Sequence, residues 1–320
     1  MLRRFVAALV LTALAGPAQA QQIRIGMGYG LAFLPLYICE DLKLVEKEAK
    51  AAQLDVKPSF ERFLGAAQIQ TALDAGLIDV GPFGTAPLLA AWEKGKGTPK
   101  QIFAISGMTT LPPTLLGNRP DQQSIADLKP EDRIALPTAS APQSYLLRLQ
   151  AEKVLGKFDR FDGQVVVLSH ADAITDLVDN KDGVAAYFAS PPFTELALRN
   201  TDVHPLLTST QVMGGKFSFL MLGATKGTID SEPQMPQIVE RAINEAARLI
   251  HDDPRRAAQI YLTHEPSEAF KGAAMEAIIR ELRDEFGSAI YGVQTIADFM
   301  GRHGELKAPP KSWKEIAAPS

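Results

Sequence analysis

Strand-like and helix-like patterns of hydrophobic residues alternate along most of this chain. Residues 23–27 and 54–60 have the two-residue alternation of half-buried strands, whereas residues 42–52 and 65–77 repeat apolar side chains with the period of a helix. Further strand-like runs span residues 79–83, 102–105, 133–136, 164–168, 183–188 and 217–222. Strands separated by helices are typical of βαβ units, so the sequence predicts an α/β fold with largely parallel sheets.

An internal repeat suggests how these units are organised. Residues 69–87 and residues 173–191 each contain a helix, a turn, a short strand and a loop of small residues that ends in proline. The match is one of pattern more than of identity, so two unrelated βα units are the alternative. A genuine repeat implies two α/β lobes that face a shared cleft, because ligands of open α/β sheets bind at the carboxyl ends of strands. Gly84, Thr85 and residues 187–190 would then lie on facing walls.

Composition and charge exclude several classes of protein. The chain has 320 residues, of which 46% are hydrophobic and 22% charged, as in a folded globular protein. Its 33 lysines and arginines against 37 aspartates and glutamates give a formal charge of -4, without the basic excess that binds nucleic acid. Cys39 is the only cysteine, so the chain has neither an internal disulfide nor a cysteine cluster for zinc or iron–sulfur. We therefore expect no cofactor and no metal.

The first twenty residues have the three regions of an export signal. Arg3 and Arg4 form a basic start, residues 5–15 form an apolar run, and Ala18-Gln19-Ala20 provides an A-x-A cleavage site. A helix of that apolar run covers only about half of a bilayer core, which is too short for a membrane span. We predict a signal peptide over residues 1–20 and export to the periplasm; an ordinary buried N-terminal helix is the alternative.

Several segments together resemble one family. Residues 34–38, Leu-Pro-Leu-Tyr-Ile, and the run from Ala75 to Pro87 are similar to the nitrate/sulfonate/taurine-type substrate-binding proteins of ABC importers. The same template fits residues 124–128, 133–137, 144–148 and 187–192, and Gly214-Gly215. The resemblance covers nearly the whole chain after residue 20. In place of the Trp-Glu-Pro that the family often has in the second-lobe loop, this chain has Phe188-Ala189-Ser190-Pro191, so the acidic contact cannot be carried over.

The resemblance implies a type II periplasmic-binding-protein fold. Each lobe would be a mostly parallel sheet flanked by helices, and a two-strand hinge would join the lobes. We expect lobe I over residues 21–118 plus 214–320 and lobe II over residues 119–213. Such a protein is a monomer that closes over a small-molecule ligand and delivers it to permease subunits in the inner membrane.

Helix starts and small residues predict one part of the ligand site. The free N–H groups at a helix start attract an anion or a carbonyl oxygen. Gly26, Gly28 and Gly30, after the first strand, would let the backbone approach a ligand closely, with a tight turn as the alternative. Candidate helix-start contacts are Gly65, Ala66, Gly84, Thr85, Ala139 and Ser140. A hydroxyl that only caps its own helix is the alternative for each threonine or serine.

Aromatic, apolar and hinge residues complete the candidate site. Tyr145 lies one turn into a helix and could reach the cleft, and Lys216 is the one plausible cation near the hinge, with a solvated lysine as the alternative. The other candidate contacts are Phe33, Met108, Tyr187, Phe188, Ser190, Gly215 and Phe217. Ordinary core packing is the alternative for the apolar members of this set.

No motif for catalysis stands out. The sequence has no G-x-S-x-G, S-x-x-K or P-loop, and His264-Glu265 lacks the second histidine of a zinc helix. The five histidines, at positions 170, 204, 251, 264 and 303, are expected at the surface. The predicted walls hold no acid and one doubtful lysine, which favours a neutral or singly anionic ligand such as a sulfonate, a carboxylate or a pyrimidine-like molecule. We therefore expect binding without turnover; an enzyme of the pyrimidine-precursor type on the same fold is the alternative.

Overall fold

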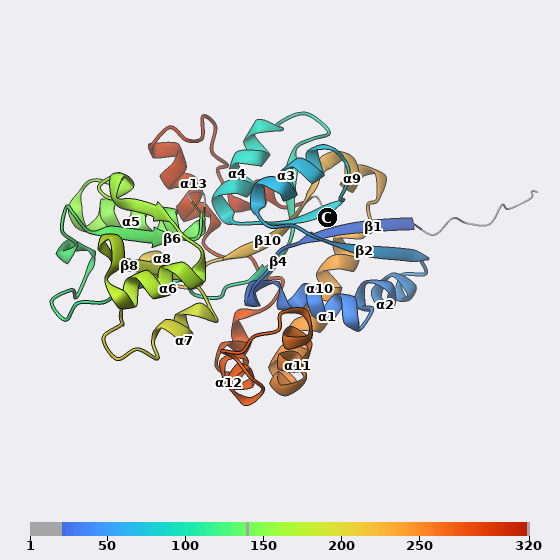
Figure 1. Cartoon of the computed structure of the whole chain (residues 1–320). Coiled ribbons are helices and arrows are strands. Elements are labelled where there is room, and N and C mark those ends of the chain that lie inside the picture. The colour runs from blue at the N-terminus through green and yellow to red at the C-terminus, as the bar shows by residue number, and fades with distance from the viewer. Residues whose placement is uncertain (1–20, 139–140, 319–320) are drawn as a thin grey trace, which may run out of the picture.

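The structure is a computed structural model that describes residues 21–138 and 141–318, apart from the side chain of Ala66. The predicted export signal, residues 1–20, and the candidate contacts Ala139 and Ser140 lie outside the described residues. Two five-stranded sheets with helices on their faces form the frame of the molecule (Figure 1). None of the helices in the described ranges is long and apolar enough to cross a bilayer.

The first sheet has the strand order β2-β1-β3-β10-β4. β1 pairs in parallel with β2 and β3, whereas β10 is antiparallel to its neighbours β3 and β4. Four strands therefore run in one direction and one in the other. The bounds are β1 (Gln21–Met27), β2 (Val56–Arg62), β3 (Val80–Phe83), β4 (Ile102–Thr109) and β10 (Leu220–Thr225).

The second sheet repeats this plan with the order β7-β6-β8-β5-β9. β6 pairs in parallel with β7 and β8, and β5 is antiparallel to β8 and β9. The bounds are β5 (Thr114–Gly117), β6 (Arg133–Leu136), β7 (Val165–Val167), β8 (Val184–Ala189) and β9 (His204–Thr208). β3 and β8, which end the two repeated segments of the sequence, occupy the same place in their sheets, so the repeat is structural.

The chain crosses between the sheets twice, and each crossing leaves an antiparallel strand in the opposite sheet. The first crossing leads from β4 to β5, and the second leads from β9 through α8 (Ser209–Met213) to β10. The two crossings lie side by side, because the N–H of Phe219 donates to the carbonyl of Thr109 and the N–H of Ser209 to that of Pro113. The limits of the lobes stay a prediction, but β5, assigned to lobe I by sequence, is hydrogen-bonded within the second sheet.

β5 and β9 are the two strands that the hydrophobic pattern does not predict. β5 has only four residues and follows Pro112-Pro113, which interrupts any alternation. β9 contains Pro205, and a proline, which has no N–H to donate, is found mostly on edge strands, where one side of the backbone has no partner. β9 is such an edge strand. Its pairing with β5 therefore depends on the completed sheet more than on local sequence.

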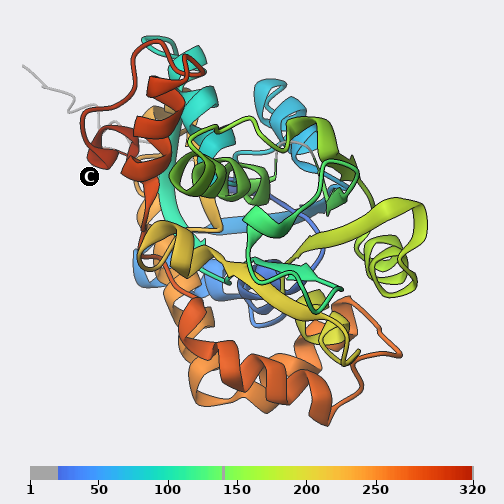
Figure 2. The ribbon, with the colours of Figure 1, turned by 90° about the vertical axis from the view of Figure 1, so that its left-hand side faces the viewer.

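Helices cover both faces of each sheet (Figures 1 and 2). One face of the first sheet packs against α1 (Leu34–Asp41), α2 (Leu44–Ala51), α10 (Met235–Asp252), α11 (Pro254–His264) and α12 (Ala273–Leu282). The other face packs against α3 (Ala66–Asp74), α4 (Thr85–Lys94) and α13 (Val293–Arg302). α9 (Lys226–Ser231) follows β10 and adds Ile229 to the cluster on the first face. The second sheet has α5 (Pro142–Leu155), α6 (His170–Asp179) and α7 (Phe193–Ala197).

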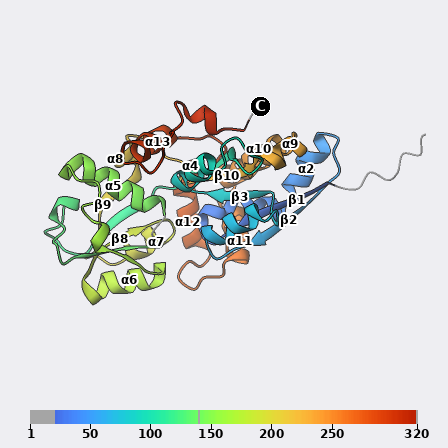
Figure 3. The same ribbon diagram turned by 90° about the horizontal axis from the view of Figure 1, so that it is seen from above.

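A single apolar core joins the two sheets on one side of the molecule. Phe83 and Leu88 from the first sheet and its helix α4 belong to the same buried cluster as Leu136 and Phe188 from the second sheet. α13 lies over this junction, between α4 and α5 (Figure 3). A cluster shared in this way holds the two units together next to the crossings, so any relative motion of the sheets has to pivot on this side.

A polar network fixes the second sheet at the ends of its strands. The guanidinium of Arg119 donates two hydrogen bonds of 2.8 Å to the carboxylate of Asp132, which is 6% exposed, and the N–H of Lys129 donates a third. The Gln164 amide donates to the carbonyls of Lys129 and Asp132. Burial by itself raises the pKa of Asp132, but Arg119 and the Lys129 N–H outweigh it, so the pKa lies below its usual value.

Removing this carboxylate charge should destabilise the protein in a pH-dependent way. We expect Asp132→Asn to lower the free energy of unfolding by about 2 kcal/mol at pH 7, because the amide cannot hold the guanidinium of Arg119 in the same way. A carboxyl with a lowered folded pKa stabilises above its unfolded pKa of about 3.9 and loses that effect as the pH falls further. The difference from the wild type should therefore shrink at pH 3.

Urea unfolding at pH 7 and pH 3 measures this difference. Asp202→Asn, on the exposed surface of the same unit, serves as the control and should leave the free energy of unfolding within about 0.5 kcal/mol of the wild type. If Asp132→Asn lowers the free energy of unfolding by the same amount at both pH values, the lowered pKa of Asp132 is contradicted.

Candidate functional site

A cleft of about 350 Å³ lies between the two sheets. The loops that follow the parallel strands line it: those after β1, β2 and β3 on one side and those after β6, β7 and β8 on the other. Because all six strands point their carboxyl ends at this gap, helix starts and turns from both units meet there. The cleft is the place where the two repeated units face each other.

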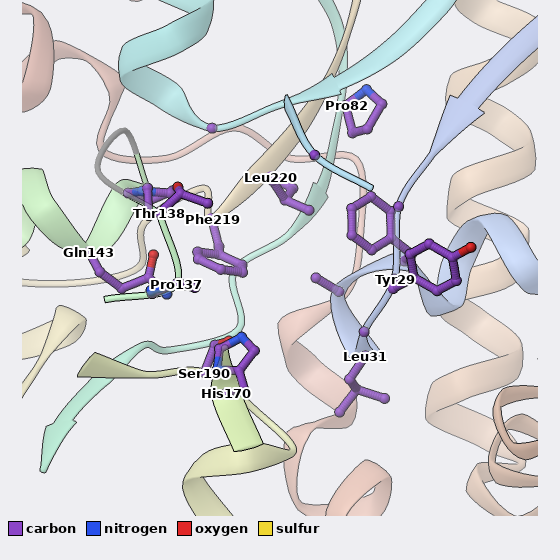
Figure 4. A pocket seen from close by; sticks show the side chains of 18 of the residues that line it. Tyr29, Leu31, Pro82, Pro137, Thr138, Gln143, His170, Ser190, Phe219 and Leu220 are labelled. Carbon is purple, nitrogen blue, oxygen red and sulfur yellow. The ribbon is translucent and has the colours of Figure 1, made fainter. Parts of the chain in front are cut away.

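The first wall consists mainly of backbone turns and aromatic rings. The chain leaves β1 through residues 28–33, and the loop after β2 adds residues 63–65. Gly84 precedes α4. Phe219 belongs to the second crossing, and Leu220 is the first residue of β10. Figure 4 shows Tyr29 and Leu31 on one side of the cleft, with Phe219 and Leu220 between them and the residues of the second wall.

The second wall is more polar. Pro137, Thr138 and Gln143 come from the segment around the start of α5, and His170 is the first residue of α6. Ser190 follows β8. Figure 4 shows Gln143, His170 and Ser190 grouped across the cleft from Tyr29. Within the described residues this wall carries no lysine or arginine.

One carboxylate lines the cleft, and it comes from outside the repeated units. Glu265 follows the last residue of α11. Its Oε1 accepts from the N–H of Gly30 and from the hydroxyl of Tyr37, and Oε2 lies 3.5 Å from the hydroxyl of Tyr261. Gly30 has φ +105°, a backbone region that favours glycine, so the turn that presents this N–H depends on that residue.

His170 is uncharged at neutral pH. Its ring stacks on Phe193 with centroids 4.3 Å apart, and its Nδ1 is hydrogen-bonded to the hydroxyl of Tyr187. Burial lowers the pKa of His170 to about 4. Burial also raises the pKa of Tyr187, which keeps its proton, so the hydroxyl can donate to Nδ1 in the tautomer that leaves this nitrogen free. The proton of the neutral imidazole is then on Nε2, so the ring presents a single donor.

The start of α5 combines one backbone donor, the N–H of Gln143, with a buried amide, because the N–H groups of Ala141 and Ser144 are already hydrogen-bonded. No side chain caps the helix at Ala141, and Pro142 occupies its first turn. Gln143 lines the cleft although it is 1% exposed, and its Oε1 has no hydrogen-bond partner among the described residues. Leaving a buried polar atom unpaired costs about 1–3 kcal/mol. A buried amide of this kind is typical of a site that is completed by a ligand.

Several residues predicted from sequence do line the cleft. Gly65 and Gly84 are the residues before α3 and α4, and neither helix has a side-chain cap there. Phe33 lies at the end of the turn after β1, and Ser190 stands after β8. Ala66 begins α3, but its side chain lies outside the described part. Contact of these residues with a ligand stays a prediction.

Other predicted residues have a structural role away from the cleft. Thr85 is 1% exposed and donates its hydroxyl to the carbonyl of Ser218 at 3.0 Å, so it fastens α4 to the return crossing. Tyr145 donates to Glu305 at 2.8 Å, which turns it toward the segment after α13. Met108, Tyr187, Phe188 and Phe217 are buried core residues. These four residues pack in the core, which was the alternative given for the apolar candidates.

Lys216, the candidate cation near the hinge, also lies outside the cleft. Lys216 donates to the carbonyl of Asp284 at 2.6 Å and pairs with Glu285 at 3.4 Å, so its charge serves the crossing. Gly215, beside it, donates its N–H to the carbonyl of Thr210. Neither residue lines the cleft.

Sequence reasoning missed the polar groups that define the walls. His170 was expected at the surface, but it is the first residue of α6, as Ala66 is of α3, so extending the internal repeat by one loop would have located it. Gln143 lies one residue beyond Pro142 in the helix start that was singled out. Glu265 had no usable signal, since it belongs to the C-terminal helices. The expectation of walls without an acid is therefore wrong.

Solved structures with a similar fold are mainly periplasmic binding proteins. The aliphatic sulphonate binding protein SsuA from Escherichia coli has a TM-score of 0.72 at 20% identity, over 94% of this chain and 94% of that chain. The alkanesulfonate-binding protein SsuA from Xanthomonas axonopodis pv. citri, bound to MOPS, has a TM-score of 0.67 at 19% identity, over 92% and 96%. The nitrate-binding protein NrtA from Synechocystis PCC 6803 has 0.64 at 13%, over 93% and 85%.

The same fold also occurs in a protein of another kind. A mutant of DszB in complex with biphenyl-2-sulfinic acid matches with a TM-score of 0.59 at 12% identity, over 94% of this chain and 97% of that chain. No protein-family model and no curated protein matches the sequence. At these identities the comparisons show the fold: this chain has the periplasmic-binding-protein fold, as the sequence predicts.

The two walls touch at Gly84. A Cβ atom at this position would lie 2.9 Å from Cγ of Pro142, at the start of α5 across the cleft. We expect Gly84→Ala to lower the free energy of unfolding by about 1–3 kcal/mol, because the rigid proline ring cannot move aside without shifting α5. Gly163→Ala, where the Cβ meets open space, should stay within about 0.5 kcal/mol of the wild type. Urea unfolding of both variants measures this, and equal stability would contradict a close contact.

The buried imidazole should make stability fall in mild acid. The pKa of His170 is lowered from 6.5 to about 4, so below pH 6.5 the unfolded chain takes up the proton before the folded one. This difference corresponds to on the order of 3 kcal/mol, lost between pH 7 and pH 4. His170→Gln removes the titrating group, so the stability advantage of the wild type over this variant should shrink across that range. Unfolding curves at intervals of pH test it, and a constant advantage would contradict a neutral buried ring.

Proposed function

We propose that this protein is the solute-binding component of an ABC importer in the periplasm, where it binds a small organic molecule without chemical turnover. The observation that carries the proposal is the cleft, which is built by the carboxyl ends of strands from both sheets. The similarity in fold to binding proteins for sulfonates and nitrate supports it. On this proposal the chain is exported by cleavage after Ala20, acts as a monomer and passes its ligand to permease subunits in the inner membrane.

Closure of the two lobes would hold the ligand. A ligand that touches both walls interacts better with a closed form than with an open one, so binding shifts the equilibrium toward closure. Leu64 lines the cleft, and its apolar side chain is 83% exposed to solvent. Covering it on closure adds apolar burial at about 25 cal/mol per Å². The core shared by the two sheets beside the crossings supports a pivot on that side.

The lining favours a ligand with an apolar or aromatic portion. Phe33, Phe63 and Phe219 offer ring surface, and the starts of α3, α4 and α5 offer backbone N–H groups for an acceptor. Among the residues predicted from sequence, we propose that Phe33, Gly65, Gly84 and Ser190 contact the ligand. Sulfonates, carboxylates and pyrimidine-like molecules are the classes that this combination suits.

A ligand screen tests the function. We expect at least one aliphatic or aromatic sulfonate, carboxylate or pyrimidine to raise the melting temperature of the purified mature chain, because a saturating ligand stabilises the folded state by mass action. Mass spectrometry of the incubation mixture should recover that ligand unchanged. Conversion into a product would favour an enzyme on this fold, and a panel without any stabilising ligand would contradict binding of these classes.

Tyr29 provides a test of where the ligand sits. Its side chain is 52% exposed and lines the cleft, so Tyr29→Ala should leave the melting temperature of the free protein nearly unchanged. An aromatic contact contributes about 0.5–1.5 kcal/mol beyond area burial, so the affinity for the stabilising ligand should fall by up to about tenfold. Tyr291→Ala, which removes a tyrosine that is 42% exposed and outside the cleft, is the matched control. Calorimetric titration in which both variants bind like the wild type would place the ligand elsewhere.

A further inference from the structure

The charges around the cleft are distributed unequally. Glu265 is the one carboxylate among its described lining residues, and none of these residues is a lysine or an arginine. The guanidinium of Arg62 is engaged with the ring and the carbonyl of His264 and lies 4.8 Å from the centre of the Tyr37 ring and 5.5 Å from that of the Tyr29 ring. A ligand in the cleft can therefore contact the carboxylate of Glu265 directly, whereas the guanidinium of Arg62 does not line the cleft and lies against tyrosine rings.

Glu265 retains acceptor capacity that the protein does not use. A carboxylate has about four acceptor positions. The N–H of Gly30 and the hydroxyl of Tyr37 both go to Oε1, while Oε2 has only the Tyr261 hydroxyl at 3.5 Å, beyond a good hydrogen-bond distance. The carboxylate is thus held in place by one oxygen and offers the other. It also stands at the carboxyl end of α11, where the helix dipole is negative.

Aromatic rings line the same wall. Tyr29, Phe33 and Phe63 all belong to the cleft lining on the side of the first sheet. The faces of such rings attract ammonium groups, and they do so more strongly where water is excluded. A carboxylate with a free oxygen among aromatic rings is a combination that suits a protonated amine.

The opposite wall offers donors and an amide. The start of α5 presents the backbone N–H of Gln143, because Pro142 has none and the N–H groups of Ala141 and Ser144 donate to the carbonyls of Thr138 and Ala141. The side-chain oxygen of Gln143 has no partner among the described residues. The neutral ring of His170 adds one N–H donor. The N–H groups of Gln143 and His170 suit a sulfonate, carboxylate or carbonyl oxygen, whereas Oε1 of Gln143 accepts and suits a donor on the ligand. Both walls offer backbone donors, but only the first carries a carboxylate among the described lining residues, so the two walls differ in charge.

We propose that the cleft selects ligands with a nitrogen-borne donor, bound at Glu265, at one end and an acceptor group, bound at the start of α5, at the other. This inference rests on the proposed solute-binding function and narrows its ligand class to amine-bearing organic acids with an apolar body. Anions without a nitrogen donor leave Glu265 unpaired and facing the ligand, so they bind more weakly.

Matched pairs of ligands test the selectivity. One pair is 3-(cyclohexylamino)propane-1-sulfonate and 4-cyclohexylbutane-1-sulfonate, which differ by a methylene in place of the amine. A second pair is 3-(benzylamino)propane-1-sulfonate and 5-phenylpentane-1-sulfonate. Calorimetric titration of the mature chain should give at least about tenfold tighter binding of an amine than of its isostere, since a hydrogen bond to a charged group is involved. If no amine binds more tightly than its isostere, the proposal is overturned.

Variants connect the selectivity to the carboxylate. Glu265→Gln keeps a carbonyl oxygen for Gly30 and Tyr37 but loses the charge, so the preference for the amine should fall to within about twofold, with weaker binding of the amine and equal or tighter binding of the isostere. Glu276→Gln, in an ion pair on α12 outside the cleft, is the control and should keep the wild-type preference. A preference that survives in Glu265→Gln would assign the amine to another group and overturn the proposal.

The outcomes separate this inference from the proposed function. If an isostere binds as tightly as its amine, the proposed function as a solute-binding protein stands, but the proposed selectivity for an amine is wrong. If the variant is too unstable to titrate, the same pairs measured on Tyr261→Phe decide, because freeing Oε2 of its long contact should preserve or strengthen the preference for the amine. A weaker preference in Tyr261→Phe would contradict a role for that oxygen.

Discussion

The site depends on an exchange of strands between the two sheets. β5 lies between β8 and β9, and β10 lies between β3 and β4, so each sheet contains one interior strand that arrives by crossing from the other. An interior strand hydrogen-bonds on both sides, and removing it would divide the sheet. The two crossings are also bonded to each other, which keeps the two sheets next to one another. With the sheets fixed in this way, the carboxyl ends of six parallel strands open onto one gap, and the cleft follows from the topology.

A cleft formed in this way consists largely of backbone. Helix starts at Gly65, Gly84 and Ala141 supply N–H groups without side-chain caps, and they recur because each βαβ unit ends a strand and begins a helix at the same edge. Backbone donors bind an oxyanion without specifying the rest of the molecule. Specificity therefore has to come from the few side chains that the loops add, which explains how one fold serves sulfonate-binding and nitrate-binding proteins alike.

The sequence predicted those features that local pattern and the repeat determine. The strands of both βαβ units and the glycines before α3 and α4 were found, because alternation and small-residue loops are local signals. Thr85 and Tyr187 were placed in the cleft because they neighbour it in sequence. A strand alternates its side chains between faces, and a helix start turns its first residue inward, so neighbours of a loop can point into the core. β5 and β9 escaped because their pairing is with distant segments, and Glu265 because its helix lies outside the repeat.

The position of Glu265 shows how a symmetric scaffold becomes selective. The two repeated units contribute loops of the same plan, and by themselves they would give a cleft with similar donors on both walls. Helices α10, α11 and α12 pack on one face of the first sheet, and α11 ends where Glu265 can accept from Gly30 and Tyr37. A carboxylate is thereby added to one wall alone among the described lining residues, so the two ends of the cleft differ in charge. A ligand with unlike ends then has one favoured orientation, which neither repeated unit could impose without that segment.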